Sequence, residues 1–183
     1  MLTFNNLGNL GRLGNQMFQY ASLKGIARKH GYDYAIPPVD LFGQNDPLVK
    51  SDKLNIYDVF NIDKKNTINV VRNPMLQERM HEFDKELFES CPDNVDLYGY
   101  YQSPKYFDHI KDEIKSDFTF SDEVESVCSE MFETIKDGKK VIALHIRRTD
   151  YTVNPNHPLQ PMEYYELGLK HFDKNTNLLV FSD

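Results

Sequence analysis

Short apolar runs alternate with a helical pattern at the start of the chain, which is the arrangement of a β-α-β unit. Residues 2–4 predict a strand, residues 15–30 a helix and residues 34–36 a second strand. Small residues spaced four apart along the helix, ending at Gly25, would let it pack closely on a sheet. Gly31 follows the helical segment and is placed to cap its C-terminus. The opening of the chain therefore predicts a parallel sheet.

A second β-α-β unit is predicted toward the end of the chain. Residues 121–135 carry apolar side chains at the spacing of an amphipathic helix. Residues 141–146 form a continuous apolar run, typical of a central parallel strand that is covered on both faces. Residues 161–172 then predict a helix, and residues 177–181 predict the strand that completes the unit.

The middle of the chain shows weaker patterns. We expect residues 39–94 to be irregular and to face a substrate, with a turn at Asn45-Asp46-Pro47 and a short strand at residues 68–71. Residues 95–102 then predict a strand, and Pro104 the first turn of a helix.

These elements predict an α/β protein with two lobes, residues 1–120 and residues 121–183. A parallel strand needs a covering helix after it, and none follows residues 177–181. We therefore expect the chain to be the front part of a larger protein or a natural truncation, with the second lobe incomplete.

Composition excludes several classes of protein. The formal net charge of −7 argues against a general nucleic-acid binder, which would show a basic excess. The N-terminus lacks the pattern of a signal peptide, and no apolar run approaches the roughly 18 residues of a membrane span. Cys91 and Cys128 make no disulfide framework. Together these features favour a cytoplasmic protein, and they leave peripheral membrane association and the oligomeric state open.

The first candidate site is the glycine-rich segment GRLGNQ at residues 11–16. Glycines between a strand and a helix let the backbone approach an anionic group at the helix N-terminus. The alternative is a tight turn that requires positive φ. Asn15 and Gln16 favour a ligand, because amides directly after the turn can orient hydroxyl groups.

The second candidate site is HIRRTDY at residues 145–151, where the predicted strand ends. Ligands of open α/β sheets bind outside the carboxyl ends of the strands. Arg147 and Arg148 suit phosphate, and Asp150 could hold one of them in place. The alternative is an exposed arginine–aspartate pair with His145 buried in the strand.

Ser182 and Asp183 follow the last predicted strand and could bind a ribose or a base, or form the N-terminal cap of a helix. No Asp-x-Asp pair occurs in the chain. A sugar-nucleotide transferase without that pair would neutralise pyrophosphate with arginine and backbone amides instead of a divalent metal.

Three segments together resemble the bacterial and viral α-1,2-fucosyltransferases of glycosyltransferase family 11. These are GRLGNQMFQYA, LYGYYQSPKYF, and HIRRTDY followed by PMEYY and LVFSD. The resemblance implies a GT-B architecture of two Rossmann-like lobes, with an acceptor-side first lobe, a donor-binding second lobe and the donor in the cleft between them. It also implies transfer of L-fucose from GDP-fucose to a galactose hydroxyl of a glycan, with inversion, and without a metal or other cofactor.

The resemblance also implies roles for single residues. Arg147 would contact the donor pyrophosphate and stabilise the departing GDP, with Arg148 and Asp150 in support. Asp150 is also a candidate general base on chemical grounds, but orienting an arginine is the favoured role. The other implied donor-binding residues are Gly14, Asn15, Gln16, His145, Arg148, Ser182 and Asp183.

Two alternatives remain beside the fucosyltransferase. Family members continue well past the FSD motif at residues 181–183, so the chain could be a non-catalytic remnant or a binding module. It could also be a transferase that uses another nucleotide sugar. The sequence does not identify the acceptor glycan.

Overall fold

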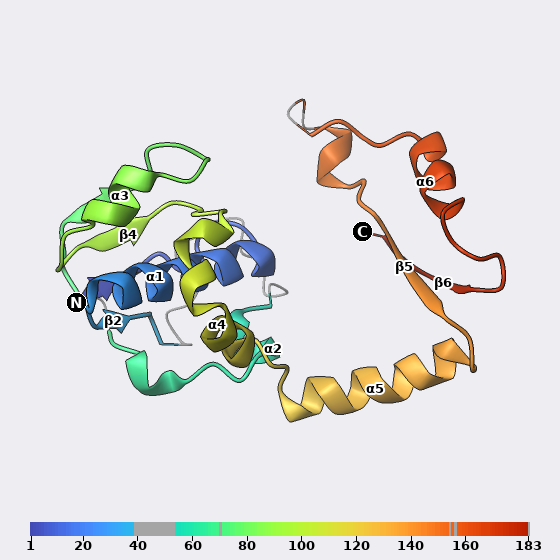
Figure 1. Cartoon of the computed structure of the whole chain (residues 1–183), viewed down its shortest axis with the longest axis horizontal. Coiled ribbons are helices and arrows are strands. Elements are labelled where there is room, and N and C mark those ends of the chain that lie inside the picture. The colour runs from blue at the N-terminus through green and yellow to red at the C-terminus, as the bar shows by residue number, and fades with distance from the viewer. Residues whose placement is uncertain (39–53, 70, 154, 156, 183) are drawn as a thin grey trace. The chain divides into compact units, whose positions relative to one another are not determined.

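The computed structural model describes residues 1–38, 54–69, 71–153, 155 and 157–182, and describes only the backbone of Asp150. Asp183 and the expected turn at residues 45–47 lie outside the described residues. The chain divides into two compact units, Met1–Ser121 and Asp122–Asp183 (Figure 1). This division lies one residue from the expected boundary.

The first unit contains a four-stranded parallel sheet in the order β2-β1-β4-β3. Its strands are β1 (Leu2–Thr3), β2 (Tyr34–Ala35), β3 (Met75–Gln77) and β4 (Asp96–Tyr98). Thr3 pairs with both Ala35 and Asp96, so β1 lies between β2 and β4. The predicted α/β class with a parallel sheet is confirmed.

One strand forms later in the chain than the sequence predicts. The described part of residues 68–71 contains no strand, whereas Met75–Gln77 form β3 beside β4. All three residues of β3 are exposed or half-buried, so the segment lacks the apolar signal of a buried strand. Its place in the sheet depends on pairing with β4, which local pattern does not reveal.

Helix α1 (Leu13–His30) is the longest element of the first unit and begins two residues earlier than expected. Gly31 caps it at φ 68° and donates its N–H to the carbonyls of Ala27 and Arg28, as predicted. Gly25 lies against the backbone of Tyr106 and Phe107, so the small residue permits close packing, although on the segment after β4.

Shorter helices complete the first unit. Pro104 occupies the first turn of a 3₁₀ helix, as its position predicts. The short helices are α2 (Ile56–Val59), α3 (Lys85–Ser90), α4 (Lys111–Asp117), and the 3₁₀ helices η2 (Lys64–Asn66), η3 (Pro104–Tyr106) and η4 (Asp108–Ile110).

The buried core of the described residues lies in the first unit. Its largest fully buried side chains include Phe4, Tyr20, Tyr101 and Tyr106. The ring of Tyr101 meets those of Phe4 and Tyr106 edge to face, with centroids 5.8 Å and 5.4 Å away. Residues that follow β4 thus join α1 and β1 in one core.

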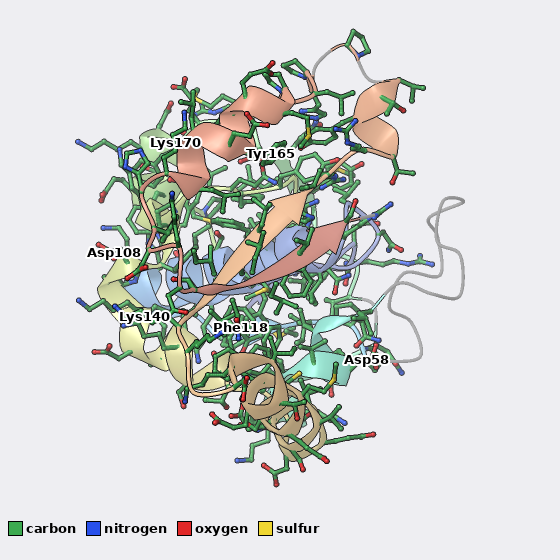
Figure 2. All side chains as sticks on the ribbon, turned by 90° about the vertical axis from the view of Figure 1, so that its right-hand side faces the viewer. Asp58, Asp108, Phe118, Lys140, Tyr165 and Lys170 are labelled. Atoms are coloured by element: carbon green, nitrogen blue, oxygen red, sulfur yellow. The ribbon has the colours of Figure 1, made fainter. Side chains whose placement is uncertain are left out.

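The second unit contains α5 (Asp122–Lys136), β5 (Val141–Ile146), α6 (Met162–Leu169) and β6 (Asn177–Ser182). The 3₁₀ helix η5 (Asp150–Thr152) follows β5. Strands β5 and β6 are parallel and pair along their whole length. Figure 2 labels Lys140 just before β5, and Tyr165 on α6. The predicted order of elements is confirmed.

The covering predicted for residues 141–146 is wrong. Side chains of β5 are half-buried or exposed, and no described residue of the second unit is buried. Among the described residues β5 pairs with β6 alone, so it is not the centre of a larger sheet. Apolar side chains of α5 such as Val127, Met131 and Phe132 are likewise exposed.

Asp84 forms the N-terminal cap of α3 and is almost fully buried. Its Oδ1 accepts the N–H of Leu87 at 3.0 Å, and its carboxylate binds the Arg79 guanidinium at 2.6 Å and 2.7 Å. The hydrogen bond from Arg79 lowers the pKa of the Asp84 carboxyl below its ordinary value, although burial opposes the shift. Asp84 thus stabilises the fold in its charged form.

We expect Gly25→Ala to destabilise the first unit. A Cβ at this position would lie 2.2 Å from the Tyr106 carbonyl oxygen and 2.8 Å from the Phe107 Cα, and neither backbone atom can move cheaply. The expected loss is about 1–3 kcal/mol in the free energy of unfolding, measured by urea denaturation. Gly14→Ala in the same helix is the control, because nothing lies within 4 Å of its Cβ. Equal stability of the two variants would contradict the close packing.

We expect Asp84→Asn to lower the free energy of unfolding by about 1–2 kcal/mol at pH 7, because asparagine keeps the cap but loses the ion pair. A lowered folded-state pKa stabilises the fold above the unfolded pKa of about 4, and the effect is lost as pH falls through the folded value. The difference between variant and wild type should therefore shrink below about pH 4. Urea denaturation at several pH values measures it, with exposed Asp33→Asn as control. A pH-independent difference would contradict the assignment.

Candidate functional site

The glycine-rich segment and the segment after β4 meet in the first unit. Gln19 of α1 donates its Nε2 to the carbonyls of Leu10 and Gly99, at 3.1 Å and 3.2 Å. Gln102 donates to the Oδ1 of Asn15. Two motifs that are some 80 residues apart in the sequence therefore lie side by side.

The turn after β4 has an uncommon backbone conformation, which Glu78 holds in place. Gly99 and Tyr101 have φ angles of 150° and 51°. The Glu78 carboxylate accepts the N–H of Tyr100 at 2.8 Å and that of Tyr101 at 3.1 Å. A Cβ at Gly99 would lie 2.5 Å from the Glu78 Cβ, so only glycine fits. Ser22 of α1 donates to the Tyr101 carbonyl at 3.1 Å.

A cavity of about 460 Å³ opens at this place, beyond the carboxyl ends of β3 and β4. The volume lies in the range of about 300–1,000 Å³ that is usual for small-molecule sites. Its walls come from the glycine-rich segment and from the residues that end and follow β3 and β4. They are Leu10, Gln77, Glu78, Arg79, Met80, His81, Tyr98, Gly99 and Tyr100.

Arg79 is the positively charged group in the cavity wall. Its guanidinium binds Asp84 and also Glu86, the latter at 2.9 Å. Hydrogen bonds to these two carboxylates raise the pKa of Arg79 above its ordinary value. The charges of Arg79 and Glu78 are therefore both engaged by groups of the protein.

The glycines at the start of the chain have different roles. Gly8 and Gly11 have φ angles of 86° and 80°, so the tight-turn interpretation holds for them. Gly14 lies in the first turn of α1 with open space around it. Asn15 is half-buried and accepts the hydrogen bond from Gln102.

The Gln16 amide, which was expected to orient hydroxyl groups of a ligand, binds the protein backbone. Its side chain is 2% exposed, accepts the N–H of Ile56 at 3.1 Å and donates to the Leu54 carbonyl at 3.3 Å. The amide joins α1 to the start of α2, so it is engaged by the backbone and does not face a ligand. Sequence reasoning missed Gln19, three residues further along the same helix.

The HIRRTDY motif lies where β5 ends in the second unit. His145 pairs with Phe181, and Ile146 pairs with Ser182, so Arg147 and Ser182 stand at neighbouring strand ends. The His145 side chain is exposed, which excludes the interpretation that it is buried in the strand. Parallel strands present this edge to ligands.

Arg147 stacks on an aromatic side chain that the sequence analysis assigned no role. Its guanidinium lies 4.7 Å from the centre of the Tyr151 ring, which stacks in turn on His157 at 4.8 Å and 13°. A guanidinium held on an aromatic face keeps its plane fixed. The signal in the sequence was Tyr151 itself, the last residue of the motif.

The other residues expected near the donor in the second unit are Arg148, Asp150, Ser182 and Asp183. The Arg148 Nη2 lies 3.7 Å from the Met162 Sδ, so this side chain contacts the start of α6. Asp150 begins η5, and only its backbone is described. Ser182 is exposed at the end of β6, and Asp183 lies outside the described residues.

Two kinds of feature are absent from the described residues. They contain no cluster of three or more histidine, cysteine, aspartate or glutamate residues that could hold a metal ion. None of the helices described is long and apolar enough to cross a membrane. The expected metal independence stays a prediction.

Comparison with known proteins shows similarity to bacterial and mammalian transferases. An O-antigen biosynthesis glycosyltransferase, WbnK, of Escherichia coli is 25% identical over 94% of this chain. An alpha-1,2-colitosyltransferase of Escherichia coli is 29% identical over 93% of it. A galactoside alpha-(1,2)-fucosyltransferase 2 of Sus scrofa is 27% identical over 80% of it.

The matches cover 70%, 64% and 42% of the lengths of these three relatives. No solved structure matches the chain. The family model described as glycosyl transferase family 11 matches residues 3–183. Because this match covers nearly the whole sequence, the chain belongs to glycosyl transferase family 11.

Proposed function

We propose that the protein is an inverting transferase that moves L-fucose from GDP-fucose to a galactose hydroxyl of a glycan, in α-1,2 linkage. The observation that carries the proposal is the Arg147–Tyr151 stack at the carboxyl end of β5, in a chain of this family. The pig relative, named as a galactoside alpha-(1,2)-fucosyltransferase, supports the donor sugar, the acceptor and the linkage.

The reaction is a direct displacement at C1 of fucose. The acceptor oxygen forms a bond to C1 while the bond from C1 to the phosphate oxygen breaks, and GDP leaves with the electron pair. The acceptor hydroxyl loses its proton to a base or to water. Negative charge grows on the leaving pyrophosphate, so a cation that is already in position stabilises the transition state most.

Arg147 is the group that we assign to this charge. Its stack on Tyr151 fixes the guanidinium before the donor arrives, so that little reorganisation is needed during the reaction. His145, Arg148 and Ser182 belong to the same strand-end region of the second unit, and we assign them to donor binding. Asp183 is assigned with them on the sequence motif alone.

Asp150 has two candidate roles. It follows the arginines at the start of η5, so its carboxylate could orient one of them or take the proton of the acceptor hydroxyl. A nucleoside diphosphate is a good leaving group and the transition state resembles an oxocarbenium ion, so strong base assistance is unnecessary. We therefore favour the orienting role.

We also propose that the two units are the acceptor-side and donor-binding lobes of a GT-B transferase, and that transfer needs no divalent metal. Arginine and backbone amides can neutralise the pyrophosphate without one. Gly14 and Asn15, in the first turn of α1, would then approach the donor from the first unit. Gln16 is withdrawn from this set because its amide is engaged.

The identity of the donor sugar requires a direct test, because one bacterial relative is named a colitosyltransferase. The deciding experiment incubates the full-length protein with a β-galactoside and a panel of GDP-linked and UDP-linked sugars, with and without EDTA. We expect an α-1,2-fucosylated product, identified by mass spectrometry and NMR, with GDP-fucose and in the presence of EDTA. Transfer from another donor only, or no transfer at all, would overturn the proposed donor.

We expect Arg147→Ala to lower kcat/KM for transfer by about 10²–10³-fold, which is typical for loss of one donor that stabilises developing charge. The kcat/KM of Arg147→Lys should lie between those of the wild type and Arg147→Ala, because lysine keeps the charge but not the planar stack. Steady-state kinetics of the full-length enzyme measure the effect. Lys139→Ala, an exposed cation before β5, is the control. Activity of Arg147→Ala within a few-fold of wild type would refute the assignment.

A further inference from the structure

We propose that the cavity at the carboxyl ends of β3 and β4 binds a neutral sugar ring of the acceptor glycan. The inference rests on the proposed function and deepens it, because it names the chain segment that receives the acceptor. Neither the family match nor the names of the relatives assigns these residues a role.

The position of the cavity is that of a ligand site. In open parallel sheets, ligands bind outside the carboxyl ends of the strands. The cavity lies at that edge of the first unit, where Gln77 and Glu78 end β3, and where Tyr98 and Tyr100 end and follow β4. Leu10 of the glycine-rich segment closes another side.

Hydrogen bonds hold the cavity walls from two sides. Glu78 fixes the turn after β4 from one side, and Gln19 joins the carbonyls of Gly99 and Leu10 from the other. Both carbonyls belong to residues that line the cavity.

This arrangement leaves one polar atom of Gln19 unsatisfied. The side chain is 0% exposed, and its Oε1 has no hydrogen-bond partner among the described residues. The reverse amide orientation is worse, because it would place the oxygen against two carbonyl oxygens. Buried groups without a partner are uncommon and costly, and they mark places where a local geometry serves a function.

The charges of the wall indicate a neutral ligand. Glu78 is engaged by the N–H groups of Tyr100 and Tyr101, and Arg79 by Asp84 and Glu86. A phosphate or carboxylate would have to compete with two protein carboxylates for Arg79. The cavity therefore has little free positive charge with which to bind an anion.

The other groups of the wall suit a sugar. Gln77, Tyr98 and Tyr100 line the cavity, and their side chains make no hydrogen bond to the described residues. An amide and two phenols can donate to and accept from hydroxyl groups, while the tyrosine rings offer apolar faces to the C–H face of a pyranose.

The experiment compares Tyr100→Ala, Tyr100→Phe and Gln77→Ala in the full-length enzyme. We expect Tyr100→Ala and Gln77→Ala each to raise the acceptor KM by about tenfold, which corresponds to about 1.4 kcal/mol. Tyr100→Phe, which keeps the ring, should have a smaller effect. The KM for GDP-fucose and the rate of GDP release without acceptor should not change. The control is Met75→Ala, because Met75 is exposed, lies on β3 like Gln77 and does not line the cavity.

The outcomes separate this inference from the function on which it rests. Unchanged acceptor KM in both Tyr100→Ala and Gln77→Ala would overturn the sugar site and leave the transferase standing. A raised KM for GDP-fucose would overturn it in favour of a donor site. Absence of transfer and of GDP release in the wild type would overturn the proposed function itself. Equal melting temperatures of wild type and variants exclude misfolding, and saturation-transfer NMR with a methyl β-galactoside measures acceptor binding directly.

Discussion

The turn that follows β4 is the constraint on which the first unit depends. Gly99 and Tyr101 adopt positive φ angles there, and the groups of this turn must find partners because water cannot reach them freely. Glu78 supplies an acceptor for the N–H groups, while Gln19 and Ser22 supply donors for the carbonyls. Three separate elements, β3, β4 and α1, are thereby fixed to one another.

The same turn connects the core to the candidate sugar site. Tyr101 leaves the turn inward and is fully buried, whereas Tyr100 lines the cavity. Burial and the nearby Glu78 charge raise the pKa of Tyr101, so its phenol stays neutral. A change that loosened the turn would therefore affect the packing of the core and the shape of the cavity together.

The second unit follows a different principle. It has no buried residue among those described, and its order depends on the parallel register of β5 and β6 and on local contacts such as the Arg147–Tyr151 stack. Its candidate donor-binding residues lie at strand ends, where the sequence motif could be recognised without a core. The first unit builds its cavity from half-buried and exposed residues of three separate segments, so this candidate site shows only in three dimensions.

Sequence alone determined what depends on neighbouring residues. The amphipathic periodicity of residues 121–135, the cap at Gly31 and the apolar run of β5 each act over a few positions, and each element formed where it was predicted. The strand end that carries Arg147 followed from the same local pattern. Tertiary structure decided the rest: that β3 forms at Met75–Gln77, and that residues some 80 positions apart lie side by side. It also decided that Gln16 binds the backbone at the start of α2, while Gln19 joins two segments of the cavity wall. These outcomes depend on which strands become neighbours in the sheet, and hydrogen bonds between distant segments leave no periodic signal in either one.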